Sequence, residues 1–202
     1  FLHQLQALKD VAIGETQQAM LEGQREKLKV GVHSLALALA ESVKSMPPDK
    51  KIWAEAIRAQ VKPIIFEEDK SGYFFVYEGT VVVTVPPKPE ITGKDLAGAK
   101  DKNGVAFVQE LAKAAQGGGG FVNYVFDKPG KGLVPKLAYS EMIPGTDYWI
   151  GTGVYIDNID DKKGEINASI GGMVRRSVMV IGGVTGALYL IVVLPLSLLI
   201  FR

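Results

Sequence analysis

One stretch near the end of the chain decides its architecture: SVMVIGGVTGALYLIVVLPLSLLIF, residues 177–201. The stretch contains no Asp, Glu, Lys or Arg, and Arg176 and Arg202 flank it. A helix of about 20 apolar residues spans the hydrocarbon core of a bilayer. A buried helix of a soluble domain is the alternative, but such helices are seldom apolar over this length. The sequence therefore predicts a transmembrane helix over residues 177–201.

The residues before this predicted span carry nearly balanced charge. All 22 acidic residues and 20 of the 23 basic residues lie before position 175, which leaves a net charge of −2. A nucleic-acid partner would require a strongly basic face, so we expect none. The chain has no Cys. A disulfide framework, a Cys-ligated metal and a thiol nucleophile are therefore excluded.

A long helix is predicted over the first 45 residues, which contain no Pro. One face of this helix is apolar and consists of Leu28, Val32, Leu35, Leu39 and Val43. The upstream part carries a weaker stripe, Leu2, Leu5, Leu8 and Ala12. A single helix cannot bury this stripe, so we expect the upstream part to pair with a partner helix. Pro47-Pro48 ends the helix, and Asp49 is predicted to cap a second one.

An antiparallel sheet is predicted in the second half of the chain. Five runs rich in aromatic and β-branched residues are predicted as strands: residues 72–77, 80–85, 121–126, 135–142 and 148–155. The first two are joined by the turn Glu78-Gly79 and form a hairpin. A short helix with Phe107, Leu111 and Ala114 on one face separates the second strand from the third. The fold class is therefore α+β.

No catalytic or cofactor-binding pattern is found in the sequence. The two histidines, His3 and His33, both fall in the first predicted helix. No His-x-x-x-His pair, nucleophile elbow or acidic metal cluster accompanies them. Gly151-Thr-Gly153 lacks the third glycine of a dinucleotide-binding loop, because position 156 is Ile. We expect no enzyme, no cofactor and no metal in this chain, and a kinase module after Arg202 stays open.

One cation, Lys136, lies among the aromatic residues of the predicted strands. An ammonium group that points inward requires a counter-charge, which a small carboxylate ligand would supply, with Tyr hydroxyls donating to the same anion. Alternatively, the side chain reaches solvent. Strict alternation places Lys136 and Tyr139 on opposite faces of one strand, unless a β-bulge intervenes. The sequence leaves both questions open.

Several blocks of the sequence form one pattern. Its first half consists of Gly72-Tyr-Phe-Phe75, residues 83–96 (VTVPPKPEITGKDL) and Asp101-Lys-Asn-Gly104. Its second half consists of residues 120–130 (GFVNYVFDKPG), Pro135-Lys-Leu-Ala-Tyr139 and residues 149–157 (WIGTGVYID). In these blocks and in their order, the chain resembles a bacterial single-Cache sensor domain over residues 25–160. The flanking helix and span resemble the layout of chemoreceptors and sensor histidine kinases.

The resemblance implies a PAS-like five-stranded antiparallel sheet outside the cytoplasmic membrane, packed on the long N-terminal helix, with a small organic acid as ligand. The predicted ligand-binding positions are Tyr73, Phe75, Thr84, Val85, Tyr124, Phe126, Lys136 and Tyr139. The family usually has His at the position of Val85 and often Trp at the positions of Phe75 and Phe126. These departures predict a pocket that prefers a more apolar acid or binds weakly.

We therefore expect a sensor in the inner membrane, with residues 1–174 periplasmic or extracellular. Its predicted parts are a membrane-proximal helical segment (1–27), a ligand-binding domain (28–160), a connecting helix (161–176) and the span (177–201). Arg175-Arg176 lie on the side called outside, against the positive-inside tendency. We also expect a preceding span before Phe1 and a cytoplasmic module after Arg202.

A homodimer is the expected assembly. Gly182 and Gly186 form a Gly-x-x-x-Gly pair in the predicted span, which lets two helices approach closely. The alternative is that these glycines pack against a preceding span of the same chain. The alternative function from a different class is a ligand-independent, dimerising structural ectodomain whose pocket is filled by side chains.

Overall fold

The computed structural model describes residues 2–128, 130–193 and 195. The chain forms two units. Phe1–Gln17 together with Asp160–Arg202 make up the first, and Gln18–Ile159 make up the second, which contains the whole sheet.

The sheet is antiparallel and contains all five predicted strands, which are β2 (Gly72–Glu78), β3 (Val81–Thr84), β4 (Gly120–Lys128), β5 (Gly132–Met142) and β6 (Tyr148–Tyr155). The strand order is β3-β2-β6-β5-β4, so β2 and β6, which are far apart in the sequence, lie side by side. A sixth strand, β1 (Ile65–Phe66), also pairs with β2. Two residues are too few to show a strand period, so β1 was not predicted.

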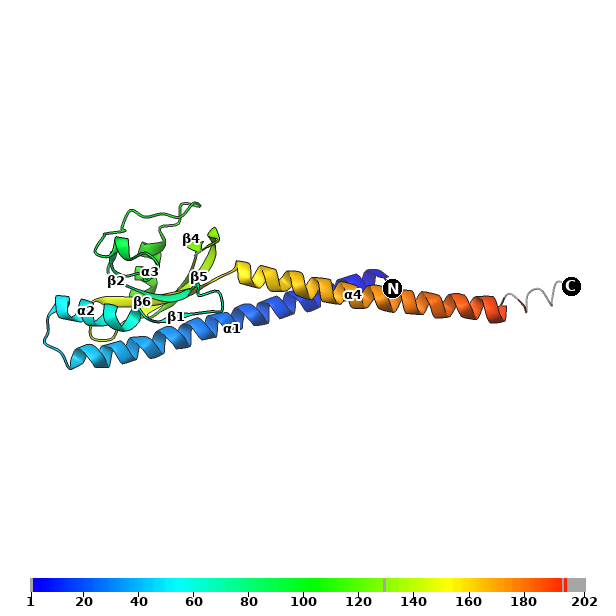
Figure 1. Cartoon of the computed structure of the whole chain (residues 1–202), viewed down its shortest axis with the longest axis horizontal. Helices are drawn as coiled ribbons and strands as arrows, with labels where there is room; N and C mark the ends of the chain where they lie inside the picture. Colours follow the sequence, from blue (N-terminus) through cyan, green and yellow to red (C-terminus); the bar gives the residue numbers. More distant parts are fainter. Residues whose placement is uncertain (1, 129, 194, 196–202) are drawn as a thin grey trace. The chain divides into compact units, whose positions relative to one another are not determined.

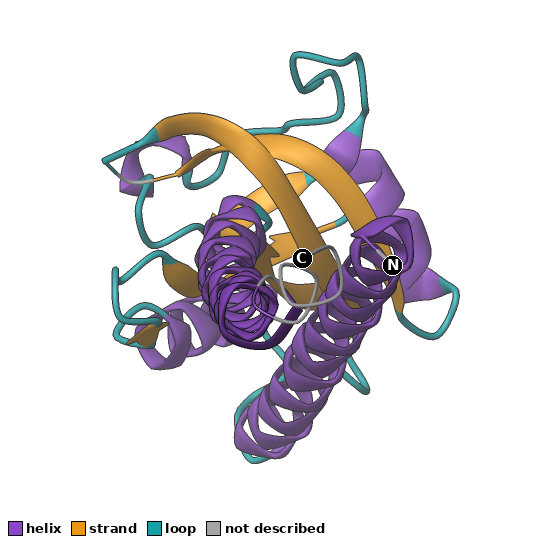
Figure 2. Ribbon diagram, turned by 90° about the vertical axis from the view of Figure 1, so that its right-hand side faces the viewer, coloured by secondary structure: helices purple, strands orange, loops and turns teal. Residues whose placement is uncertain are grey.

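Helices cover both faces of this sheet (Figures 1 and 2). α1 (Leu2–Lys44) and α2 (Lys50–Val61) pack on one face, and α3 (Phe107–Gln116) packs on the other. The predicted apolar face of α1 is confirmed, because Leu28, Val32, Leu39 and Val43 are buried in the core on the α1 side. Burial of these side chains stabilises the packing by about 1.5–3 kcal/mol each.

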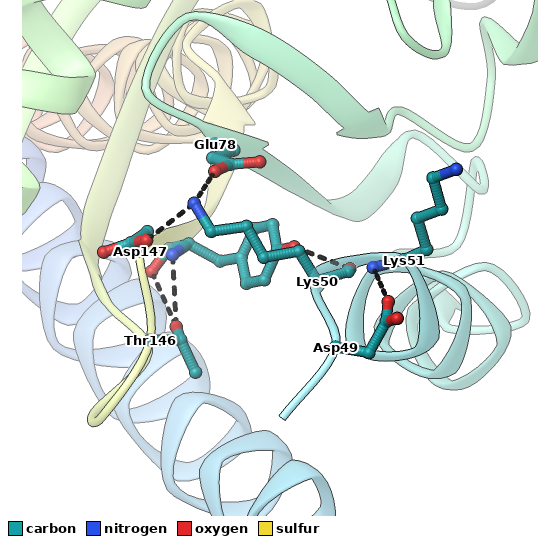
Figure 3. Close-up of polar contacts among 7 residues, drawn as sticks. Asp49, Lys50, Lys51, Glu78, Thr146 and Asp147 are labelled. Atoms are coloured by element: carbon teal, nitrogen blue, oxygen red, sulfur yellow. Dashed lines mark hydrogen bonds and ion pairs between the residues drawn. The ribbon is translucent and has the colours of Figure 1, made fainter. Parts of the chain in front are cut away.

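Polar contacts attach the start of α2 to the sheet (Figure 3). As predicted, Asp49 caps the helix, with its carboxylate accepting two backbone N–H groups of the first turn. The Lys50 Nζ pairs with Glu78 at the end of β2 and, at 2.8 Å, with Asp147 in the β5–β6 loop. The Tyr148 hydroxyl donates to the Lys50 carbonyl at 2.9 Å. These contacts hold α2 over the central strands.

α4 (Asp157–Leu188) follows β6 and continues as a π-helical segment, Tyr189–Val193. Within the described residues, Ala168–Val192 is long and apolar enough to cross a membrane, and none of its most apolar window is buried in the protein. The absence of burial argues against a core helix. The predicted connecting helix and the start of the predicted span therefore share one helix. The end of the predicted span, residues 194 and 196–201, lies outside the described residues.

Candidate functional site

The side chains of β5 alternate between the two faces of the sheet. Leu137 and Tyr139 belong to the core on the α1 side, whereas Ala138 belongs to the core on the α3 side. The pairing of β5 with β4 and β6 runs without a register shift, so no bulge is present between Lys136 and Tyr139. The two side chains therefore point to opposite faces, and Lys136 points toward the α3 side.

Lys136 is buried, with 1% of its surface exposed, so the solvent-reaching arrangement is excluded. Its Nζ donates a hydrogen bond to the Tyr73 hydroxyl at 3.0 Å. The Nζ also lies over four aromatic rings, at 4.1 Å from the ring centre of Tyr73, 4.6 Å from Tyr155, 5.5 Å from Phe126 and 5.8 Å from Phe75. Among the described residues, no carboxylate forms an ion pair with it.

The strand register explains this aromatic cage. Lys136 on β5 is paired with Tyr124 on β4 and with Tyr155 on β6, so the three side chains stand in one row across the sheet. Directly paired residues of antiparallel strands have Cβ atoms about 4.5–5.5 Å apart, which brings a ring next to the lysine stem on each side. Tyr73 and Phe75 come from β2, which is the next strand beyond β6.

Burial shifts the proton equilibria of this site. It lowers the pKa of Lys136 to about 7, because the charged amine loses its hydration without gaining a carboxylate partner. Burial also raises the pKa of Tyr73 and Tyr124 well above the usual range of a phenol. Both hydroxyl groups therefore stay protonated at physiological pH and can donate hydrogen bonds. The site therefore combines one amine that can be charged or neutral near pH 7 with neutral hydroxyl groups that donate hydrogen bonds.

A small cavity lies between α3 and the sheet beside Lys136. Its lining is formed by Tyr73, Phe75, Tyr77, Val85, Phe107, Leu111, Tyr124 and Phe126. The volume of about 10 Å³ corresponds to about one water molecule. A carboxylate with a carbon tail therefore requires the aromatic side chains around it to move outward.

Five of the eight predicted ligand positions line this cavity: Tyr73, Phe75, Val85, Tyr124 and Phe126. Lys136 adjoins it through the hydroxyl of Tyr73. Tyr139 lies apart from the cavity, on the opposite face of the sheet, where its ring contacts Phe121 and its hydroxyl donates to Glu141 at 3.2 Å. Thr84 is buried at the end of β3 and does not line the cavity.

Four residues of the site were not among the predicted positions. Phe107 and Leu111 were expected only as the packing face of a helix, and Tyr77 only as a strand aromatic. For Tyr155, strand alternation indicates only the face: it lies two residues after Gly153 on one strand, so both residues are on the same face of the sheet. The pairing of Tyr155 with Lys136 depends on the register of two strands, and that register is not visible in either strand alone.

The Gly151-Thr-Gly153 pattern makes room for the site. A Cβ atom at Gly153 would lie 2.7 Å from the Leu137 carbonyl oxygen and 2.8 Å from the Lys136 Cε. A Cβ atom at Gly151 would collide with the Phe75 ring. Both glycines therefore let side chains of neighbouring strands lie flat across β6.

The profile described as Single Cache domain 2 matches residues 20–168, which is most of the chain. The chain belongs to the Single Cache domain 2 family. The predicted resemblance is thereby confirmed, and so is the absence of an enzymatic role, because the Cache domain is a non-enzymatic ligand-binding module.

Two curated relatives are membrane signalling proteins. The methyl-accepting chemotaxis protein CtpM of Pseudomonas aeruginosa is 30% identical over 196 residues, covering 94% of this chain and 34% of the relative. The sensor histidine kinase MctS of Rhizobium johnstonii is 29% identical over 152 residues, covering 73% of this chain and 33% of the relative. The chain thus spans about a third of the length of these relatives.

Solved Cache structures share the fold. A methyl-accepting chemotaxis protein from Vibrio parahaemolyticus superposes with a TM-score of 0.64 at 30% identity, covering 73% of this chain and 99% of that structure. A second structure, described as the structural basis for carboxylic acid recognition by a Cache chemosensory domain, has a TM-score of 0.55 at 24% identity, covering 71% and 97%. The second likeness shows the fold alone.

Proposed function

We propose that this Cache domain binds a small carboxylate as the extracytoplasmic sensor of a bacterial transmembrane receptor. The observation that carries the proposal is Lys136, a buried amine that no described carboxylate neutralises. A carboxylate ligand would provide that charge, and the Tyr73 hydroxyl would donate to it. The apolar lining of the cavity favours an acid with a short hydrocarbon tail.

A thermal-shift screen tests this proposal directly. Acetate, propionate and butyrate are expected to raise the unfolding temperature, whereas propionamide, which has the shape of propionate without its charge, is expected to have no effect. For an acid that binds, calorimetry on Lys136→Met should show a loss of about 1.5–3 kcal/mol, which is about 10- to 150-fold in affinity. Lys113→Met, on the exposed side of α3, is the matched control. Unchanged affinity in Lys136→Met would place the anchor elsewhere.

The alternative is a ligand-independent structural ectodomain, and the size of the cavity favours it. The side chains leave only about 10 Å³, which holds no organic acid without rearrangement. The same screen separates the two functions. If no short acid shifts the unfolding temperature, the side chains themselves fill the core on the α3 side, and the domain acts as a spacer.

For the membrane arrangement, we propose that residues 1–174 lie outside the cytoplasm and that the receptor is in the inner membrane. The helix Ala168–Val192 supports this arrangement, as do the relatives in chemotaxis and two-component signalling. Residues 28–160 are then the ligand-binding domain. Reporter fusions after Arg202 should score as cytoplasmic, and export of the reporter would contradict the orientation.

The proposed assembly is a homodimer with contact between the membrane helices. Gly182 and Gly186 lie on α4, one turn apart, so two copies can approach closely on that face. Gly186→Cys in this cysteine-free chain should crosslink efficiently between copies in membranes. Efficient crosslinking only from positions 184 and 188 would show that a different face is in contact.

A further inference from the structure

Among the described residues, the groups around Lys136 are neutral or already paired. The titratable groups that face its amine are phenols: Tyr73 from β2, Tyr124 from β4 and Tyr155 from β6. The other contacts are the hydrocarbon rings of Phe75 and Phe126. α3 contributes only apolar side chains to the core on this side.

The charged groups that the structure describes just beyond the aromatic cage do not neutralise Lys136. Lys128 lies 5.5 Å from the centre of the Tyr155 ring and pairs with Asp69 at 2.9 Å. On the other side, Lys88 lies 5.2 Å from the centre of the Phe126 ring and pairs with Asp127 at 3.1 Å. Each of these carboxylates therefore already has a lysine partner. The cage holds an amine whose charge is not balanced by the described residues.

We propose that this site takes up a proton together with its ligand, so that carboxylate binding depends on pH as well as on carboxylate concentration. The inference rests on the proposed carboxylate-binding function. Its balance is simple: a carboxylate anion, the neutral Lys136 amine and one proton from the solvent combine into a carboxylate–ammonium pair. The only new covalent bond is the third N–H bond of the amine.

Desolvation is the reason for this coupling. Because burial lowers the pKa of Lys136 to about 7, the amine is mostly neutral at pH 8. A carboxylate entering the cavity beside a neutral amine would be a buried charge without a partner, which is strongly unfavourable. Beside an ammonium group the two charges compensate each other, so the bound state retains the proton. The phenols cannot replace it, because burial raises the pKa of Tyr73 and Tyr124 and keeps them protonated in both states.

The sign of the pH effect follows from linkage. Below about pH 7 the amine is protonated before binding, so affinity changes little with pH. Above pH 7 each binding event must first protonate the amine, and affinity falls by up to about tenfold per pH unit. The sensor would therefore respond more strongly to the same carboxylate in neutral or slightly acidic medium than in alkaline medium.

Calorimetry of the full chain in detergent micelles, with propionate as the probe, measures this proton directly. Titrations at pH 8 are run in HEPES and in Tris, whose ionisation enthalpies differ. The difference between the two observed enthalpies should correspond to uptake of close to one proton, and the Kd should rise about tenfold between pH 7.5 and pH 8.5. Equal enthalpies in the two buffers, with clear binding, would overturn the inference and leave the carboxylate function intact. No binding at pH 6 or pH 8 would overturn both.

Two variants identify the group that takes up the proton. Lys136→Arg keeps a positive charge at all accessible pH values, so propionate binding to it should take up no proton and should not depend on pH between 7 and 8.5. Lys113→Met, exposed on α3, should take up the same proton as the unmodified chain. If Lys136→Arg unfolds, Lys136→Met provides the second measurement, because any residual binding to it should also lack proton uptake. Proton uptake that persists in a folded variant at position 136 would overturn the assignment.

Discussion

Replacing Lys136 by Met is expected to stabilise the unliganded domain while weakening its ligand binding. The pKa of Lys136 falls from 10.5 to about 7 on folding, which corresponds to about 5 kcal/mol of unfavourable free energy at and below neutral pH. Met has a similar length and no charge to desolvate. It loses the hydrogen bond to Tyr73, which is worth about 1 kcal/mol. The net stabilisation expected at pH 7 is therefore about 4 kcal/mol.

The dependence on pH distinguishes this cause from better packing. The pKa of Lys136 is lower in the folded state than in the unfolded state, so the unfolded chain binds more protons between pH 7 and 10.5. Stability of the unmodified protein should therefore gain relative to Lys136→Met as pH rises through this window. The advantage of the variant should be largest at pH 7 or below and absent near pH 10.5.

Urea unfolding of both proteins in the same detergent, from pH 6 to pH 10, provides the measurement. Comparison between the two proteins cancels the titration of all other groups. Lys113→Met, on the exposed side of α3, should follow the unmodified protein at every pH. A constant difference between Lys136→Met and the unmodified protein across the whole range would refute the reasoning, since a charge-based cost cannot be independent of pH.

Three further substitutions test the surroundings of the site. Gly153→Ala places a methyl group against backbone and against the stem of Lys136, so it should cost about 1–3 kcal/mol of stability and also lower propionate affinity in calorimetry. Ser140→Ala removes the buried hydrogen bond at 2.8 Å that joins β5 to an α3 carbonyl, and urea unfolding should show a loss of about 1 kcal/mol. Asp69→Asn breaks the ion pair with Lys128, which helps to lower the pKa of Asp69 to about 2. Because Asp69 is partly exposed, its loss should cost less than about 1 kcal/mol at pH 7, and the difference should vanish as pH falls from 4 through 2. An undiminished difference at pH 2 would contradict the electrostatic cause.

The secondary structure could be predicted because its signals are local. The apolar period from Leu28 to Val43 specifies a helix face, and alternation with turn residues specifies the strands. Asp49 caps α2 through its own neighbours. The two-residue strand β1 has no such local signal, since it exists only through pairing with Gly72 and Tyr73.

The site could be predicted only in part, because it depends on the register in which the strands pair and on the face of the sheet that each side chain occupies. Alternation alone separates Lys136 from Tyr139, and the structure follows it. The predicted site includes both residues, and the structure places them on opposite faces of β5. In contrast, Tyr155 joins Lys136 through the pairing of β5 with β6, and Phe107 joins Tyr124 through packing of α3, with ring centres 4.9 Å apart. Neither contact leaves a signal within one element.

The position of Tyr155 connects the site to the membrane helix along the chain. Its ring lies over the Lys136 amine, its hydroxyl donates to the Asp127 carbonyl at 2.9 Å, and α4 begins only two residues later, at Asp157. Formation of an ammonium group under this ring strengthens its attraction to the ring face, because a charged amine binds an aromatic ring more strongly than a neutral one. Under the proposed function, a bound carboxylate would pair with the same amine. Both effects would then act on the ring of Tyr155, the last residue of β6.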